Sequence, residues 1–220
     1  MTIAEEGLKN NWGANIGSVL LKEYPQGIKT EAKAWAASGS DARMSGCKLP
    51  VVILSGSGNQ GITASVPVIR YAMNLGVSRE KLYRALLISD LVTIHQKSGI
   101  GRLSAYCGAV SAGVGAGVGI AYLLDGSYDA IAHTIVNAVA IISGTICDGA
   151  KPSCAAKIAA SVDAGILGYN MYRNQQEFKG GDGIVTKGVE NTIANIGVLA
   201  QEGMRQTDRT ILSIMTEKCK

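Results

Sequence analysis

Apolar residues recur at helical spacing through most of the chain. The clearest amphipathic pattern runs from Arg79 to about Gln96, where apolar side chains recur three or four positions apart, as at Leu82, Leu86 and Ile94. The run Gly108–Leu124 carries no charged residue over seventeen positions and contains five glycines. Because a membrane-spanning helix needs about 20 apolar residues, this glycine-rich run favours a tightly packed buried helix.

Start and stop signals divide the rest of the chain into further helices and loops. The expected helices are Thr2–Asn10, Gly13–Glu23, Ile28–Ser38, Ile62–Leu75, Ala155–Tyr172, Val185–Gly203 and a last helix from Thr207. Gly39–Lys48 is predicted as a loop that places Asp41 and Arg43 beside a site, and Leu49–Leu54 is a short β-prone run. We therefore expect a mainly α fold, one helical domain over residues 1–220, with closely packed Gly/Ala-rich buried helices and at most one short strand region.

Composition supports a small-residue core in a reducing compartment. Hydrophobic residues make up 47% of the chain and charged residues 17%, with one Phe and two Trp. Five cysteines without a secretory signal indicate reduced thiols and the cytoplasm. The net charge of +4 is scattered, which argues against nucleic acid, and the apolar excess favours a homo-oligomer with no membrane association.

Three cysteines stand in a setting that is typical of metal ligands. Cys147-Asp-Gly-Ala-Lys-Pro-Ser-Cys154 surrounds two thiols with turn residues, and Cys107 lies upstream. Thiolates are soft ligands, so zinc and an iron–sulfur cluster are the candidates. The alternatives are buried core cysteines and a structural zinc site completed by His95 or His133, although neither histidine has the usual short spacing to a cysteine.

A glycine-rich turn forms the second candidate site. Ser55-Gly-Ser-Gly-Asn59-Gln-Gly61 gives G-x-G-x-x-G between a β-prone run and a helix. A dinucleotide site needs a second strand after that helix, but a further helix follows. The turn is therefore predicted to hold a carboxylate on free backbone N–H groups. Gly56, Ser57, Gly58 and Gly61 would form this cradle, and Asn59 is either a polar contact to substrate or a helix cap.

Lys97 is the candidate proton carrier. It ends the Arg79 helix just before Cys107, where burial would lower its pKa. The alternative is a solvated cation at the end of the helix.

The residues around the cysteines also carry a family resemblance. Ser-Gly-Thr-Ile-Cys147-Asp-Gly-Ala-Lys-Pro-Ser-Cys154 and Leu103-Ser-Ala-Tyr-Cys107-Gly-Ala resemble the L-cysteine desulfidase family and the alpha part of bacterial iron–sulfur L-serine dehydratases. The likeness extends to Ser40-Asp41-Ala42-Arg43-Met44 and to the glycine-rich turn. It implies that Cys107, Cys147 and Cys154 hold a 4Fe-4S cluster, without pyridoxal phosphate.

The implied activity is β-elimination from L-cysteine to pyruvate, ammonia and sulfide, with L-serine dehydratase as the alternative. On this interpretation Lys97 and Asn59 are catalytic, and Arg43 with the glycine-rich turn binds the small amino-acid substrate. Full members of the family are about twice as long, and the N-terminal catalytic half is absent here. A second hypothesis is therefore a non-catalytic, cluster-bearing half that needs this partner or a separate subunit.

Two cysteines stay outside this set. Cys219 is either an exposed tail thiol or a ligand of the open iron, and it resembles the C-terminal cysteine of some serine dehydratases only in being a terminal thiol. Cys47 is given no role.

Overall fold

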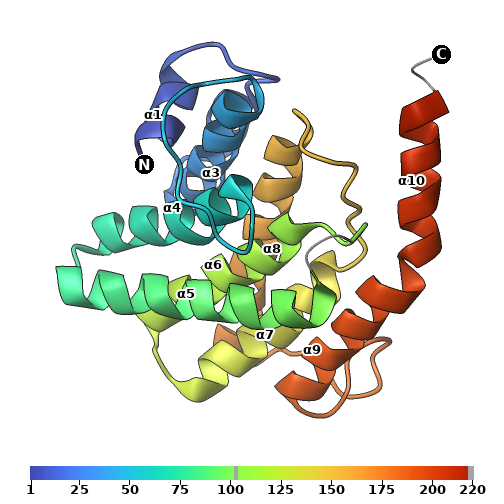
Figure 1. Ribbon diagram of the computed structural model, residues 1–220. Coiled ribbons are helices and arrows are strands. Elements are labelled where there is room, and N and C mark those ends of the chain that lie inside the picture. The colour runs from blue at the N-terminus through green and yellow to red at the C-terminus, as the bar shows by residue number, and fades with distance from the viewer. Residues whose placement is uncertain (102–103, 218–220) are drawn as a thin grey trace.

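The structure, a computed structural model, describes residues 1–101 and 104–217. This part of the chain contains ten α-helices and one short π-helix, and no β-sheet (Figure 1). The elements are α1 (Thr2–Lys9), α2 (Ile16–Glu23), α3 (Ile28–Met44), α4 (Gly58–Leu75), α5 (Arg79–Ile100), α6 (Gly108–Leu124), α7 (Tyr128–Ile142), α8 (Cys154–Arg173), α9 (Val189–Val198), η1 (Leu199–Gly203) and α10 (Arg205–Glu217). The mainly α prediction is confirmed.

Helix α6 is the centre of the fold, with α5 on one side and α8 on the other (Figure 1). Its glycines form two rows, one facing each neighbour. A Cβ atom at Gly117 would lie 2.6 Å from the backbone of Gly165 on α8, and one at Gly115 would lie 2.6 Å from the Ser89 carbonyl on α5. These close approaches explain why the uncharged run is a buried helix. No helix in the described residues is long and apolar enough to cross a membrane.

Helix α3 continues to Met44, so the expected Gly39–Lys48 loop is wrong for residues 39–44 and holds only for residues 45–48. Small residues in its second half pack closely on α1 and α4. For example, a Cβ atom at Gly39 would lie only 3.1 Å from Ile62 on α4. Burial therefore outweighs the weak helix propensity of these residues. Asp41 is fully buried on this helix, and its Oδ2 accepts a hydrogen bond from the Gly17 N–H at 3.3 Å. Asp41 thus caps α2 and does not lie on a loop beside the site.

The β-prone run Leu49–Leu54 forms no strand. It contributes only an isolated bridge between Leu54 and Ser57, and its backbone lies across the first turn of α4. A Cβ atom at Gly61 would lie 1.9 Å from the Val52 carbonyl oxygen. Since the described residues contain no sheet, the G-x-G-x-x-G turn lies outside any strand–helix–strand unit.

The C-terminal region departs from the single helix predicted over Val185–Gly203. The helix starts at Val189, and its end unwinds into the π-helical turn η1. Helix α10 then projects beside the body of the molecule and has no buried residue (Figure 1). Its Met215 side chain still lies beside Gly149 of the loop before α8.

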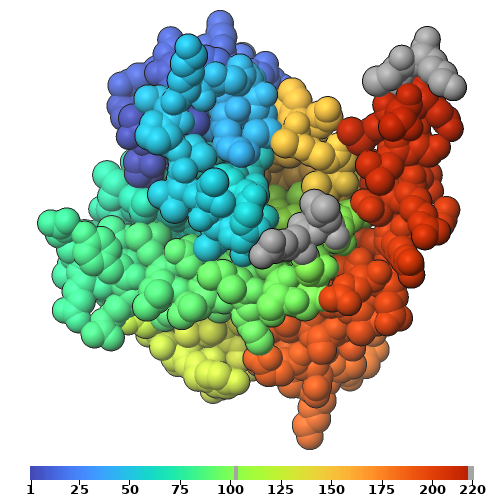
Figure 2. Space-filling view, viewed as in Figure 1, coloured from blue at the N-terminus to red at the C-terminus, as the bar shows by residue number. Residues whose placement is uncertain are grey.

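The outer face of α5 carries an exposed row of large apolar side chains. Tyr83, Leu87, Leu91 and Ile94 are between 45% and 58% exposed. The inward face of the same helix is built from small or polar residues such as Ala85, Ser89 and Thr93. Helix α5 lies on the front face of the molecule in Figure 2, so these bulky side chains point toward solvent.

Candidate functional site

Two of the three predicted cysteines are brought together by a short backbone pairing. Tyr106 and Ile146 form an isolated antiparallel bridge, so Cys107 lies opposite Thr145, Cys147 lies opposite Ala105, and the two cysteines are diagonal neighbours. The Cys107 N–H donates to the Thr145 carbonyl at 3.1 Å, and the Cys147 N–H donates to the Ala105 carbonyl at 2.6 Å. Two segments forty residues apart in the sequence thus present their thiols to one another.

The two thiols share a hydrogen bond. Donation by the Cys107 thiol lowers the pKa of Cys147, and the same bond together with burial raises the pKa of Cys107. The two thiols therefore share one proton and ionise as a pair.

Cys154 begins α8 and lies near the pair. Its sulfur accepts the Lys151 N–H at 3.5 Å and donates to the Gly149 carbonyl at 3.6 Å, both in residues 143–153, the cysteine loop. The charge of the Cys154 thiolate also raises the pKa of Cys107. Lys157, one turn further along α8, forms an ion pair with Asp148 and interacts electrostatically with all three cysteines. The three thiols therefore surround one end of α8.

The donor set fits an iron–sulfur group in chemistry, because three thiols lie within one region and soft ligands favour such groups. Among the described residues, however, no three His, Cys, Asp or Glu side chains are arranged so that they could hold a metal ion. The Cys154 sulfur instead bonds to its own loop, at the Lys151 N–H and the Gly149 carbonyl. Cys219 lies outside the described residues.

Neither histidine supports the zinc alternative. His95 Nε2 pairs with Glu190 at 2.8 Å, and His133 Nδ1 pairs with Glu177 at 2.6 Å and stacks on Tyr172. Each ring is thus engaged with a glutamate, away from the cysteines.

Lys97 lies where the sequence predicted it. It is 8% exposed in the last turns of α5. Burial lowers its pKa, while the charges of Cys147 and Cys107 oppose that shift. Lys97 is therefore a buried amine that faces the cysteine pair.

The glycine-rich turn meets Arg43 at the start of α4. Ser57 is the residue before the helix, and no side chain caps this end. Arg43 Nη1 donates to Asn59 Oδ1 at 3.2 Å, and a Cβ atom at Gly58 would lie 2.6 Å from Arg43 Nε. The guanidinium thus lies on the bare backbone of Gly58, although Arg43 comes from a helix and not from the predicted loop.

The two outer glycines of the turn differ from each other. Gly56 has a φ of 84° and open space at its Cβ position, so it shapes the turn. Gly61 is packed against Val52 and leaves no room for a ligand at its Cα.

Gln60 is a site residue that sequence reasoning missed. It is 7% exposed, and its amide lies against Gly108, the first residue of α6 and the neighbour of Cys107; a Cβ atom there would lie 2.6 Å from Gln60 Nε2. Gln60 therefore connects the glycine-rich turn to the cysteine pair. The sequence feature that could have pointed to Gln60 was its position next to Asn59 in that turn.

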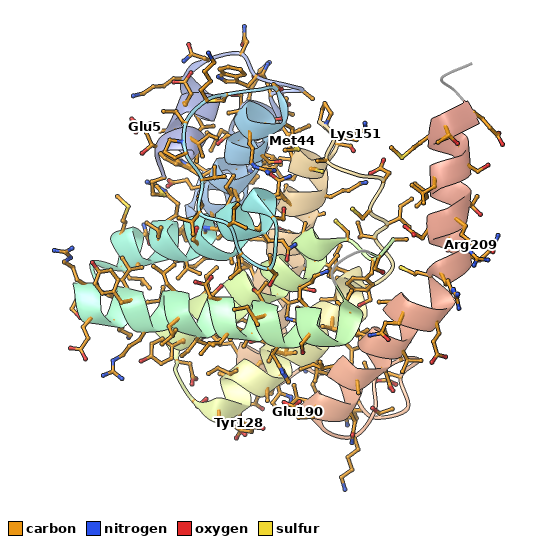
Figure 3. The ribbon with its side chains drawn as sticks, viewed as in Figure 1. Glu5, Met44, Tyr128, Lys151, Glu190 and Arg209 are labelled. Carbon is orange, nitrogen blue, oxygen red and sulfur yellow. The ribbon has the colours of Figure 1, made fainter. Side chains whose placement is uncertain are left out.

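These elements lie around one hollow. The space-filling view shows a recess between the loop before α4, the start of α8 and α10 (Figure 2). In Figure 3, Met44 at the end of α3 and Lys151 in the cysteine loop lie on the same side of the molecule. The contacts between α3 and α8 agree with this view.

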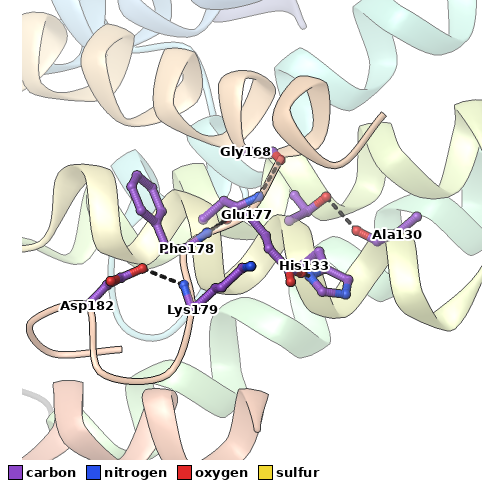
Figure 4. A network of polar contacts seen from close by, with 9 residues as sticks. Ala130, His133, Gly168, Glu177, Phe178, Lys179 and Asp182 are labelled. Atoms are coloured by element: carbon purple, nitrogen blue, oxygen red, sulfur yellow. Dashed lines mark hydrogen bonds and ion pairs between the residues drawn. The ribbon is translucent and has the colours of Figure 1, made fainter. Parts of the chain in front are cut away.

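A separate cavity of about 410 Å³ lies between α7 and the loop before α9. Figure 4 shows His133 and Glu177 on its wall and the Lys179 N–H donating to Asp182 Oδ2 at 2.6 Å. Apart from His133, a candidate ligand of the zinc alternative, none of the site residues predicted from the sequence lines this cavity.

Comparisons with known proteins agree with the family resemblance of the sequence. The serine dehydratase alpha chain family matches residues 1–213. The chain is 66% identical over 217 residues to a UPF0597 protein of Desulfitobacterium hafniense (strain Y51), which covers 99% of this chain and 50% of that protein. It is 55% identical over 213 residues to a UPF0597 protein of Lachnoclostridium phytofermentans, covering 97% and 51% of the two chains. It is also 48% identical over 221 residues to a UPF0597 protein of Treponema denticola, covering 98% and 51%.

The chain spans about half the length of these curated relatives. No solved structure matches it.

Proposed function

Because the chain belongs to the serine dehydratase alpha chain family, we propose that it is the cluster-bearing half of an iron–sulfur lyase. The reaction is β-elimination from a small L-amino acid, with L-serine or L-cysteine as substrate. The family match favours L-serine. The observation that carries the proposal is the pairing of Cys107 with Cys147 next to the turn that holds Arg43 and Asn59.

Each part of this site has a separate task. Cys107, Cys147 and Cys154 are the ligands of a 4Fe-4S cluster, and the bound cluster supplies a Lewis acid for the leaving group. Arg43 and the uncapped start of α4 bind the substrate carboxylate, because a guanidinium and free helix N–H groups both favour an anion.

Lys97 takes the proton from the α-carbon. Its burial lowers the pKa of the ammonium group, which increases the fraction of neutral amine at a given pH. Loss of the α-proton and of the β-substituent leaves an aminoacrylate, which hydrolyses to pyruvate and ammonia.

The length of the relatives supports a partner for turnover. They carry about as much chain again as is present here, and the remaining half must pack on some surface of this domain. The apolar row on α5 is a candidate for that surface, because large apolar side chains that are exposed together on one helix face are typical of an interaction site. We assign the α5 row to the other half of the longer proteins; the homo-oligomer expected from composition remains a prediction.

A substrate assay tests the proposed reaction. The anaerobically reconstituted chain is assayed with the remaining half of the Desulfitobacterium relative, measuring pyruvate from L-serine and sulfide from L-cysteine. We expect pyruvate from L-serine with the parent and none with Lys97→Met. Equal turnover by Lys97→Met would remove the lysine from the mechanism, and no product from either amino acid would contradict the lyase assignment.

A further inference from the structure

Two buried glutamine carbonyls lie against the start of α6 without a hydrogen-bond partner. Gln60 comes from α4 and Gln96 from α5, and they are 7% and 3% exposed. The Oε1 atom of each is buried and accepts no hydrogen bond from the described residues. Folded proteins seldom leave such atoms unpaired, so each one requires an explanation.

The two glutamines differ in how they are held. The Gln96 amide group donates to the Val92 carbonyl at 3.2 Å and to the Ser111 carbonyl at 3.4 Å, which ties it into the α5–α6 contact. The Gln60 amide instead lies against Gly108, beside Cys107. Only Gln60 also belongs to the first turn of α4, where the Arg43–Asn59 pair lies.

We propose that the Gln60 side-chain carbonyl accepts a hydrogen bond from the ammonium group of the substrate amino acid. The inference rests on the proposed function, which places the substrate carboxylate at Arg43 and the start of α4. In an α-amino acid the carboxylate and the ammonium group are attached to the same carbon atom. A carbonyl acceptor one residue beyond Asn59, on the side of Cys107, therefore suits the ammonium group.

The groups around Gln60 favour a hydrogen-bond acceptor for the substrate at this position over a further hydrogen-bond donor. Arg43 and the uncapped N–H groups of α4 already supply donors for the carboxylate. A buried acceptor without a partner is what an ammonium group, which carries only donors, requires. The contact would also discriminate between an amino acid and its deaminated analogue, because the analogue leaves the carbonyl unpaired.

The first test needs no ligand. Gln60→Met keeps the length of the side chain and removes its polar atoms, so the thermal midpoint of the ligand-free chain should stay the same or rise. Gln206→Met, on the exposed face of α10, is the matched control. A clear fall in the midpoint for Gln60→Met alone would assign Gln60 a structural hydrogen bond and overturn the proposal.

The second test measures binding by anaerobic calorimetry on the reconstituted chain, with L-serine and 3-hydroxypropionate, which lacks only the amino group. We expect the parent to prefer L-serine, Gln60→Glu to keep this preference, and Gln60→Met to lose about tenfold or more of it. The chain alone suffices, because every contact invoked lies within it.

The outcomes separate the two proposals. If the parent binds L-serine and Gln60→Met retains the preference, the ammonium contact is wrong and the proposed function stands. If the parent binds neither compound, both fail.

Discussion

Gly58 shows how a single missing side chain shapes the candidate site. A Cβ atom at this position would lie 2.6 Å from Arg43 Nε and 2.5 Å from Val51 Cγ2. Both distances are too short for a real Cβ contact, so any larger residue displaces the guanidinium. The glycine in the turn is therefore required by the approach of Arg43, a relation that the sequence alone does not reveal.

Gly58→Ala should weaken binding of L-serine by about tenfold, because the displaced Arg43 no longer pairs with the carboxylate. Iron and sulfide content should stay at the parent level. Gly99→Ala is the control, since its new Cβ atom would lie a comfortable 3.7 Å from Gly197. Unchanged affinity in Gly58→Ala would show that Arg43 does not contact the substrate.

Asp90 offers a pH-dependent prediction at the same scale. Burial raises the pKa of this carboxyl on α5 above its ordinary value. A raised folded-state pKa means that protonation stabilises the fold below it, and that this contribution is lost as pH rises through it. Asp90→Asn should therefore have the higher thermal midpoint at pH 7, and the difference should shrink as the pH falls toward 4. A difference that is constant with pH would contradict this assignment.

At the scale of elements, the two glycine rows of α6 hold the bundle together. Gly117 meets Gly165 on α8, and Gly113 meets Ser161 on the same helix. The uncharged glycine-rich run allowed α6 to be predicted as a buried helix, because its composition leaves no polar face. The partners α5 and α8 were also predicted from their patterns, but the residues that meet the α6 glycines, such as Ser89 on α5 and Gly165 on α8, are known only from the fold.

Gly117→Ala should lower the free energy of unfolding by about 1–3 kcal/mol, because the added methyl group lies 2.6 Å from the Gly165 backbone and forces the helices apart. Chemical denaturation measures the change, with Gly99→Ala as the control. A loss no larger than that of the control would mean that α6 and α8 separate without cost.

The elements that were misplaced from the sequence depend on tertiary packing, which the sequence pattern does not show. In α3, small residues read as a loop because their helix propensity is weak, yet their burial against α1 and α4 fixes the helix through Met44. The π-helical turn η1 has no sequence signal of its own. At the site, the cysteines and Lys97 were proposed from their residue types and sequence context and Arg43 from the family resemblance, whereas Gln60 depends on a tertiary contact with Gly108.

At the scale of the whole molecule, the exposed apolar row on α5 is not explained by the structure of this chain alone. Four large side chains on one helix face are about half exposed, while the relatives contain about twice this length of chain. A partner half that covers the row would account for both observations.

Leu87→Glu combined with Leu91→Glu should prevent association with the remaining half of the Desulfitobacterium relative, since two charges would be buried without partners. Co-expression followed by light scattering on the eluted species measures the complex. The stability of the isolated chain should barely change, because both side chains are more than half exposed. Leu167→Glu, at a 40% exposed position on α8, should leave the complex intact.

Two results would contradict the assignment of this surface. A complex that survives the double substitution would place the partner elsewhere. A parent chain that self-associates, and becomes monomeric on double substitution, would make a second copy the occupant.

The iron and sulfide content of the anaerobically reconstituted chain tests the central claim most directly. We expect about four irons and four sulfides per parent chain, a large loss in Cys107→Ser, Cys147→Ser and Cys154→Ser, and full content in Cys47→Ser. Cys154 is the sharpest case, since its sulfur bonds to its own loop and must turn toward the other two. A parent chain without iron and sulfide, or a Cys147→Ser chain that binds as much as the parent, would contradict the account.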